Sequence, residues 1–271
     1  MSEIADQDIP TLPVTSVTKL LTDEECPCVS ILIPCYLRRK FKPLILCNLR
    51  QIKYPKKKVE VVILHDGPED LFESKEELEF FRESLMGMTL KYVYEKDIRR
   101  SIGEKRNKLV KLASHKILIN MDSDDIYLPS YLLHSVSALK EHKVGITSSS
   151  SMIFVYPEHD YKLTGIRCGY KRQGHEAVMC FTKKHFNSMG GFVSKGTDAN
   201  RGEGVKMISY NEKKMVNLDI RMLMICVCHS GDAGEGNTIN KDRFLDAEYD
   251  ASLNDLPHLT VLKEIIKRSQ L

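Results

Sequence analysis

Tryptophan is absent from this chain of 271 residues, and aromatic residues make up only 7% of it. An excess of one charge is also lacking, because 40 Lys and Arg against 37 Asp and Glu leave a net charge of +3. That balance excludes the strongly basic composition of a protein that coats duplex nucleic acid, so we expect no nucleic-acid partner. No run approaches the roughly 18 apolar residues of a membrane-spanning helix, and we expect no stable membrane insertion.

Cysteine is sparse as well. Eight cysteines are too few for a disulfide scaffold in a chain of this length. The acidic, polar residues 1–13 lack the basic and apolar regions of a secretory signal peptide, so we expect reduced thiols and a cytoplasmic location. Cys26/Cys28 and Cys226/Cys228 form C-x-C pairs rather than the C-x-x-C pairs usual in zinc sites. We interpret them as free thiols, the second pair buried on one side of a strand.

The first half of the chain contains a regular alternation of strand and helix patterns. Short apolar runs begin at Val29, Val59, Leu90 and Lys116, and their starts are 30, 31 and 26 residues apart. Apolar positions recur every three or four residues over 40–53, 73–86, 103–113 and 130–140. A parallel βαβ unit needs about 30 residues, so this spacing predicts an α/β fold with a parallel sheet.

The second half is less regular. Strands are expected within 145–156, 176–182 and 216–228, helices over 183–189 and 259–268, and a loop over 194–204. We therefore predict a loose N-terminal arm over 1–25, an α/β half over 26–143, and a mixed half over 144–271 of the same domain.

Polar residues follow three of the predicted strands. Pro34–Tyr36 follow the first strand, His65–Gly67 the second, and Asp122–Asp125 the fourth. Because ligands of open parallel sheets bind beyond the carboxyl ends of the strands, we expect these segments to converge on one crevice.

The acidic segment is the sharpest of the three. Asp122, Asp124 and Asp125 place three carboxylates within four residues, and these repel each other unless a cation or hydrogen-bond donors compensate them. Their oxygens suit Mg²⁺ or Mn²⁺, and Asp122 and Asp124 would share a face if the chain stays extended. Such a metal could stabilise a diphosphate leaving group. The alternative is an acidic turn that caps the helix expected at 130–140.

Three further features are candidates, each with a plainer alternative. Asp66 ends the second strand and could accept hydrogen bonds from a base, or it could simply form a turn before glycine. Arg106 and Asn107 lie in a helix opened by Gly103, where they could instead be surface residues. His229 follows an apolar run and could ligate a metal, or it could be an ordinary buried or solvated histidine.

The order of these segments resembles the family 2 type of glycosyltransferase with the GT-A fold. The resemblance covers roughly residues 28–240, and its specificity lies in the joint order of loose motifs. The matching segments are Val29–Tyr36, Gln51 with Tyr54–Pro55, Val61–Pro68, Gly103–Asn107, Asp122–Asp125, Met189–Phe192, Gly202–Glu203, and His229 with Asn237–Thr238.

The resemblance implies a Rossmann-type, mostly parallel sheet flanked by helices, with a nucleotide-sugar-binding half over 26–143 and an acceptor-binding half over 144–271. It implies a nucleotide-sugar donor, usually a UDP-sugar, a saccharide or glycan acceptor, and Mn²⁺ or Mg²⁺. By position, Asp124 and His229 would bind the metal. The donor would contact Pro34, Tyr36, Asp66, Arg106, Asn107, Asp122 and Ser123.

Family members of this type usually invert the anomeric centre, which requires a carboxylate base. The usual Gly-Glu-Asp reads Gly202-Glu203-Gly204 here, so Glu203 is the first choice of base. Asp198, in the same polar loop, is its rival. The usual Asp-Asp-Gly-Ser after the second strand reads His65-Asp66-Gly67-Pro68.

Two other functions remain open on the sequence. A nucleotidyltransferase on a related sheet would need a glycine-rich, basic phosphate loop after the first strand. Arg38, Arg39 and Lys40 supply the basic residues there, but the segment has no glycine. A non-catalytic module that binds a nucleotide or sugar is favoured only by the altered Gly202-Glu203-Gly204.

Overall fold

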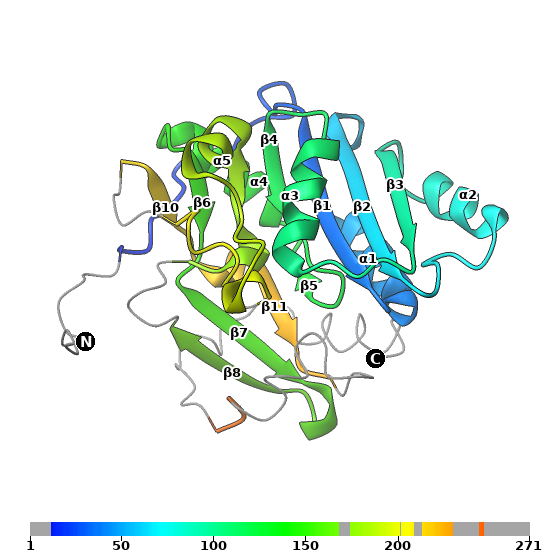
Figure 1. Ribbon diagram of the computed structural model, residues 1–271. Helices are drawn as coiled ribbons and strands as arrows, with labels where there is room; N and C mark the ends of the chain where they lie inside the picture. The colour runs from blue at the N-terminus through cyan, green and yellow to red at the C-terminus, as the bar shows by residue number, and fades with distance from the viewer. Residues whose placement is uncertain (1–11, 168–173, 201, 209–212, 230–243, 247–271) are drawn as a thin grey trace.

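The computed structural model describes residues 12–167, 174–200, 202–208, 213–229 and 244–246 (Figure 1). Their framework is a seven-stranded sheet with the order β10-β6-β9-β4-β1-β2-β3. β9 pairs antiparallel with β4 and β6, and the other neighbouring strands pair in parallel. The strands are β1 (Val29–Tyr36), β2 (Val59–Gly67), β3 (Thr89–Lys96), β4 (Ile117–Asn120), β6 (Ile146–Ser148), β9 (Cys180–Thr182) and β10 (Met215–Asn217).

Helices flank this sheet (Figure 1). They are α1 (Lys42–Gln51), α2 (Lys75–Glu83), α3 (Ile102–Leu112), α4 (Tyr131–Glu141) and α5 (Lys183–Met189). Alternation along β1 divides the core between the two faces. Ile31 belongs to the cluster that holds α1 and α4 residues such as Leu44 and Leu132, while Leu32 belongs to the cluster that holds Leu109 of α3.

A four-stranded sheet with the order β5-β11-β7-β8 lies below the larger sheet in the view of Figure 1. Its strands are β5 (Ile126–Tyr127), β7 (Ser151–Tyr156), β8 (Lys162–Arg167) and β11 (Met224–Val227). β11 pairs antiparallel with β5 and in parallel with β7. This pairing matters for the site, because β5 follows the acidic segment directly and His229 follows β11 by two residues.

The parallel sheet and flanking helices expected from the sequence are confirmed. β1 and β2 extend beyond the apolar runs, to Tyr36 and Gly67, so polar residues lie within the strands. The stretch expected as a strand over 176–182 begins instead as the 3-10 turn Glu176–Val178, and only Cys180–Thr182 is extended. The helix expected over 259–268 lies outside the described residues.

The N-terminal arm differs from expectation over its described part. Leu12 is buried, Val14 forms a bridge with Asn217, and the Thr15 amide donates to the Asn217 carbonyl at 2.8 Å. Residues 12–15 therefore lie against the β10 edge of the larger sheet. Cys226 and Cys228 are buried and form no disulfide within the described residues, as expected, while Cys28 is exposed.

None of the helices in the described part of the chain has the length and apolar character needed to cross a bilayer.

Candidate active site

The acidic segment after β4 forms a turn rather than an extended stretch, so its three carboxylates reach different partners. The Asp122 amide donates to the Tyr127 hydroxyl at 2.7 Å, which ties the turn to β5. Asp125 Oδ1 accepts from the Val227 amide at 3.0 Å and thereby joins the turn to β11. Asp122 and Asp124 each meet a different arginine, which separates the site into two clusters.

The first group is the Arg38 cluster, made of Arg38, Asp124 and His229. Arg38 Nη2 donates to Asp124 Oδ2 at 3.0 Å, and His229 Nε2 lies 3.4 Å from the same oxygen. Asp124 and His229 are both buried, and the Phe41 ring covers the imidazole with 4.8 Å between ring centroids. Burial alone would raise the pKa of Asp124, but Arg38 and His229 outweigh it and hold the pKa at about 2.

The donor atoms of the Arg38 cluster fit a divalent cation in part. An imidazole nitrogen and a carboxylate oxygen 3.4 Å apart can ligate one ion, and a mixed nitrogen and oxygen set suits Mn²⁺ better than Mg²⁺. Within the described residues, no group of three or more His, Cys, Asp or Glu side chains is arranged to hold a metal. Asp124 and His229 would therefore need further oxygens from a bound phosphate and from water.

The second group is the Arg106 cluster, made of Arg106, Asp122, Glu203 and Glu176. Arg106 Nε donates to Glu203 Oε1 at 2.8 Å, and its Nη2 donates to Asp122 Oδ1 at 2.9 Å. Arg106 is 2% exposed, and its Nη1 has no hydrogen-bond partner among the described residues. Burial raises the pKa of Asp122 even though Arg106 opposes the shift.

Glu176 was missed by the sequence reasoning. It begins the 3-10 turn before β9, and its Oε1 accepts from the Gly204 amide at 3.0 Å, next to Glu203. Burial raises the pKa of Glu176 to about 7, and the charge of Glu203 adds to the shift. Its only local signature is an acid at the start of an apolar run, a pattern too common to single it out.

Helix α3 carries Arg106 into this cluster. Ser101 and Glu104 form a capping box at its start, so the first turn is fixed. A Cβ at Gly103 would lie 1.8 Å from the Val193 carbonyl oxygen, so only glycine lets the helix approach the loop that bears Glu203 this closely. Asn107, one residue after Arg106, donates to the Phe192 carbonyl and accepts from the Phe192 amide, at 2.8 and 2.9 Å. Its amide thus fixes the Met189–Phe192 segment.

Asp66 ends β2 fully buried and is engaged on both carboxylate oxygens. Lys105 Nζ donates to Oδ1 at 2.6 Å, and the Arg100 amide donates to Oδ2 at 2.7 Å. Tyr36, its neighbour across β1 and β2, lies with its ring 4.4 Å from the Arg99 guanidinium carbon and 5.1 Å from Lys105 Nζ. Gly67 permits this placement, because a Cβ there would lie 3.0 Å from the Tyr36 ring.

The remaining predicted residues lie at different depths. Pro34 is buried within β1, and Ser123 is buried in the turn between Asp122 and Asp124. Asp198, the rival base, is exposed in the 3-10 turn Thr197–Ala199, whereas Glu203 is 5% exposed. His65, which replaces the first acid of the usual motif, donates from Nε2 to the Glu69 carbonyl at 2.7 Å, and burial lowers its pKa.

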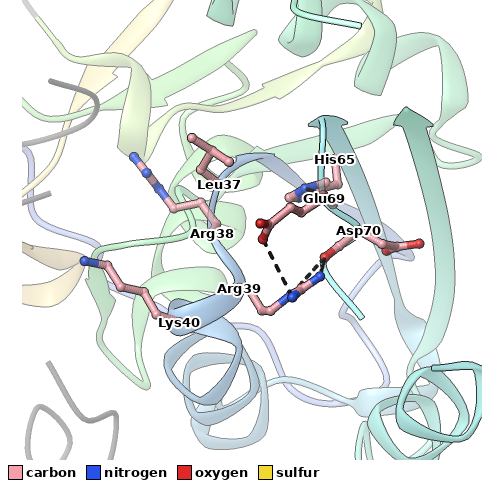
Figure 2. A pocket seen from close by; sticks show the side chains of 7 residues that line it. All are labelled: Leu37, Arg38, Arg39, Lys40, His65, Glu69 and Asp70. Atoms are coloured by element: carbon pink, nitrogen blue, oxygen red, sulfur yellow. Dashed lines mark hydrogen bonds and ion pairs between the residues drawn. The ribbon is translucent and has the colours of Figure 1, made fainter. Parts of the chain in front are cut away.

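A hollow of about 280 Å³ opens at the carboxyl ends of β1 and β2 (Figure 2). Arg39 spans its floor, with Nε and Nη2 donating to the Asp70 carbonyl at 3.1 and 2.8 Å and Nη1 lying 3.6 Å from Glu69. Arg38 borders the same hollow, which thus adjoins the Arg38 cluster. The lining residues are Leu37, Arg38, Arg39, Lys40, His65, Glu69 and Asp70.

A family model described as Glycosyl transferase family 2 matches residues 30–197, which is more than half of the chain. The chain belongs to glycosyltransferase family 2. No curated protein matches it by sequence. The match ends at Thr197, so it includes the Arg38 cluster except for His229 and stops before Glu203.

Solved structures agree on the fold of this glycosyltransferase. Mannosyltransferase PcManGT from Pyrobaculum calidifontis, in complex with GDP-Man and Mn²⁺, is similar with a TM-score of 0.58 and 16% identity, over 96% of this chain and 76% of that one. S. aureus TarS 1–349 in complex with UDP-GlcNAc is similar with a TM-score of 0.55 and 15% identity, over 89% of this chain and 66% of that one. The GT-A-like fold is thereby confirmed.

Proposed function

We propose that this family 2 glycosyltransferase is metal-dependent and inverting, and that it moves a sugar from a UDP-sugar to a hydroxyl of a saccharide or glycan. The observation that carries the proposal is the turn after β4. Its Asp124 carboxylate lies beside His229, and its Asp122 carboxylate belongs to the Arg106 cluster, which contains Glu203. One turn thus joins a candidate metal position to a candidate base. The GDP-Man, Mn²⁺ and UDP-GlcNAc bound in similar structures support a nucleotide-sugar and a metal.

The donor would lie across the ends of β1, β2 and β4. We assign Pro34 and Tyr36 to the nucleoside pocket and Asp122 with Ser123 to the neighbourhood of the ribose. Asp66 is engaged by Lys105 and the Arg100 amide, so it acts by fixing the wall of that pocket as well as through any bond to the base. Arg106 and Asn107 support the donor site from α3, Asn107 through the Phe192 backbone.

Asp124 and His229 are the residues we assign to the metal. A bound Mn²⁺ or Mg²⁺ would supply positive charge to the diphosphate as it leaves the sugar. Asp124 suits this role because its low pKa keeps the carboxylate ionised at any physiological pH. The His229 ring packs against the Phe41 ring, and this contact limits how far the imidazole can move.

Glu203 is the residue we assign as the base, with Asp198 as its rival. The carboxylate would accept the proton of the acceptor hydroxyl while that oxygen attacks the anomeric carbon and the bond to the diphosphate breaks. Arg106 orients Glu203 through the 2.8 Å bond, so the carboxylate is already in place before the acceptor binds. Asp198, by contrast, lies exposed in the 3-10 turn Thr197–Ala199.

The test is a panel of nucleotide-sugars incubated with the protein and Mn²⁺, with released nucleotide measured and product anomers assigned by NMR. We expect turnover of a UDP-sugar with inversion, and a loss of more than about 100-fold in Asp124→Asn. Asp160→Asn is the matched control, because it removes an exposed turn carboxylate where asparagine tolerates the same positive φ. Equal rates for Asp124→Asn and wild type, or binding of UDP-sugars without any turnover, would contradict the proposal.

A further inference from the structure

Arg38 makes a buried contact that the proposed roles leave unexplained. Its guanidinium donates to Asp124 Oδ2 at 3.0 Å, and the two side chains are only 12% and 9% exposed. Nη1 of Arg38 also donates to the Tyr36 carbonyl at 3.3 Å, and its guanidinium carbon lies 5.4 Å from the Phe41 ring centroid. A fixed positive charge therefore lies on the carboxylate oxygen that faces His229.

We propose that Arg38 and the divalent cation compete for Asp124, and that Arg38 pairs with the donor diphosphate when the cation takes its place. This inference rests on the proposed function. A cation held by both Asp124 Oδ2 and His229 Nε2 would lie within a few ångströms of the guanidinium. Two positive charges at one carboxylate oxygen repel strongly away from bulk water, so one of them must leave.

The Arg38 side chain has space to move away from Asp124, whereas the side chain of its neighbour Arg39 is held in place. Arg39 is held by two hydrogen bonds to the Asp70 carbonyl, and Figure 2 shows its side chain directed away from that of Arg38. Arg38 borders the hollow of about 280 Å³ at the carboxyl ends of β1 and β2, where ligands of such sheets bind. A diphosphate near the metal would offer the displaced guanidinium two or more anionic oxygens, which it can bind in a forked arrangement.

The exchange links the two ligands of the site. A donor that attracts Arg38 frees Asp124 for the metal, and a metal on Asp124 frees Arg38 for the donor. The two affinities must then rise together by the same factor, because coupling between binding sites is reciprocal. Direct bonds between metal and diphosphate also contribute to that factor, so removal of Arg38 should reduce the coupling without abolishing it.

The experiment measures Mn²⁺ affinity without nucleotide, from the loss of the free-ion EPR signal, and then repeats the titration with saturating UDP. Arg38→Gln should bind Mn²⁺ alone about 5- to 10-fold more tightly than wild type, the lower end of typical couplings, and should gain less from UDP. Arg38→Lys keeps the charge but loses the fork, so it should lie between the two. Arg82→Gln removes the same charge from an exposed pair with Glu79 on α2 and should leave both affinities unchanged.

A second measurement needs no substitution that alters the site. In the wild-type protein, the Arg38 Nε–H resonance should shift on titration with diamagnetic Mg²⁺ plus UDP, while the Arg82 resonance stays fixed. Circular dichroism checks that each variant is folded before titration. If Arg38→Gln does not fold, the Arg38 Nε–H resonance of the wild-type protein tests the competition instead.

The outcomes separate this inference from the proposed function. If wild type binds Mn²⁺ and UDP but Arg38→Gln binds Mn²⁺ alone no more tightly, the competition is refuted and the function stands. An Arg38 resonance unmoved by Mg²⁺ and UDP would refute it as well. If wild type binds neither Mn²⁺ nor UDP, the metal-dependent function and the inference both fail.

Discussion

The Arg38 cluster and the Arg106 cluster each pair an arginine with an aspartate of the turn after β4, yet they differ in charge balance. Around Arg38, one carboxylate meets a guanidinium and an imidazole. Around Arg106, one guanidinium is shared by Asp122 and Glu203, with Glu176 beside them. In the first cluster a single acid faces an arginine and a histidine, whereas in the second the acids outnumber the one arginine.

That difference reverses the pKa shifts of two acids only two residues apart. Asp124 is buried and Asp122 half-buried, and loss of contact with water raises the pKa of a carboxyl group. At Asp124 the effect of Arg38 and His229 exceeds that of burial, and the pKa falls to about 2. At Asp122 the effect of burial exceeds that of Arg106, and the pKa rises. One cluster is thus suited to keep a charged metal ligand, and the other to hold groups that exchange protons near neutral pH.

The sharpest way to test this division is through the base, where the largest effect is expected. Glu203→Gln keeps the shape and the acceptor for Arg106 but removes basicity, so kcat should fall about 10²- to 10⁴-fold. Mn²⁺ and UDP affinities should change little, because we assign Glu203 to the acceptor hydroxyl and assign it no contact with the metal or the nucleotide. The matched variant is Asp198→Asn in the same loop. A large loss in Asp198→Asn alone would transfer the role of base to Asp198.

The free energy of unfolding tests the charge balance of the two clusters when Arg106, which Asp122 and Glu203 share, is removed. Arg106→Met leaves the buried Glu203 and the half-buried Asp122 without their common partner, and the free energy of unfolding should fall by about 3–5 kcal/mol. Arg38→Met should cost clearly less, because Asp124 keeps its contact with His229. Urea unfolding of both variants at pH 7 makes the comparison. Equal losses would show that the two arginines serve their acids alike.

The pH dependence of stability should expose the excess acid of the Arg106 cluster. The pKa of Glu176 in the folded protein, about 7, lies above the ordinary glutamate value of 4.5, so its contribution to stability is fully present below pH 4.5. It is lost as the pH rises through 7, by about 1–3 kcal/mol between pH 5 and 8. Glu176→Gln keeps an acceptor for the Gly204 amide and should remove that slope. Urea unfolding at both pH values measures this change for wild type and for Glu176→Gln. An equal change in the free energy of unfolding for the two proteins would show that Glu176 is not its source.

The smallest effect concerns the helix that delivers Arg106. Ser101 and Ser74 cap α3 and α2 in the same way, each accepting from the amide three residues on at 3.2 Å. Either serine changed to alanine should cost about 1 kcal/mol of unfolding free energy. Only Ser101→Ala should also lower kcat, by a few-fold, because α3 carries the Arg106 cluster. A similar kcat in both variants would mean that the cap does not help to position Arg106.

Much of the framework could be predicted from the sequence because its determinants are local. The apolar runs at Val29 and Val59 predicted β1 and β2, and the helical period over 183–189 predicted α5. The turn after β4 was also predictable as a candidate site, since its acids follow a buried strand. The short strands of the second half were harder, because three or four residues such as Cys180–Thr182 hold no reliable period.

The partners of the site residues were beyond the sequence. Arg38 and Asp124 are 86 residues apart, and Arg106 and Glu203 are 97 apart. At such separations, the sequence around one residue does not predict its partner. Asp66 fits the motif by itself, but only the fold reveals that Lys105 and the Arg100 amide occupy its oxygens. Glu176 belongs to no motif, and its raised pKa comes from burial and from the charge of Glu203, which lies 27 residues further along the chain.

By itself, the sequence determined a mostly parallel sheet, the strand ends at which polar residues gather, and the family to which the motif order belongs. These follow from hydrophobic period and residue order, which need no knowledge of distant contacts. The tertiary structure alone decided which carboxylate meets which arginine, how deeply each is buried and therefore which way each pKa moves. Those properties depend on strand order and on the return of β11 to the turn after β4, where charges distant in the chain come within 4 Å.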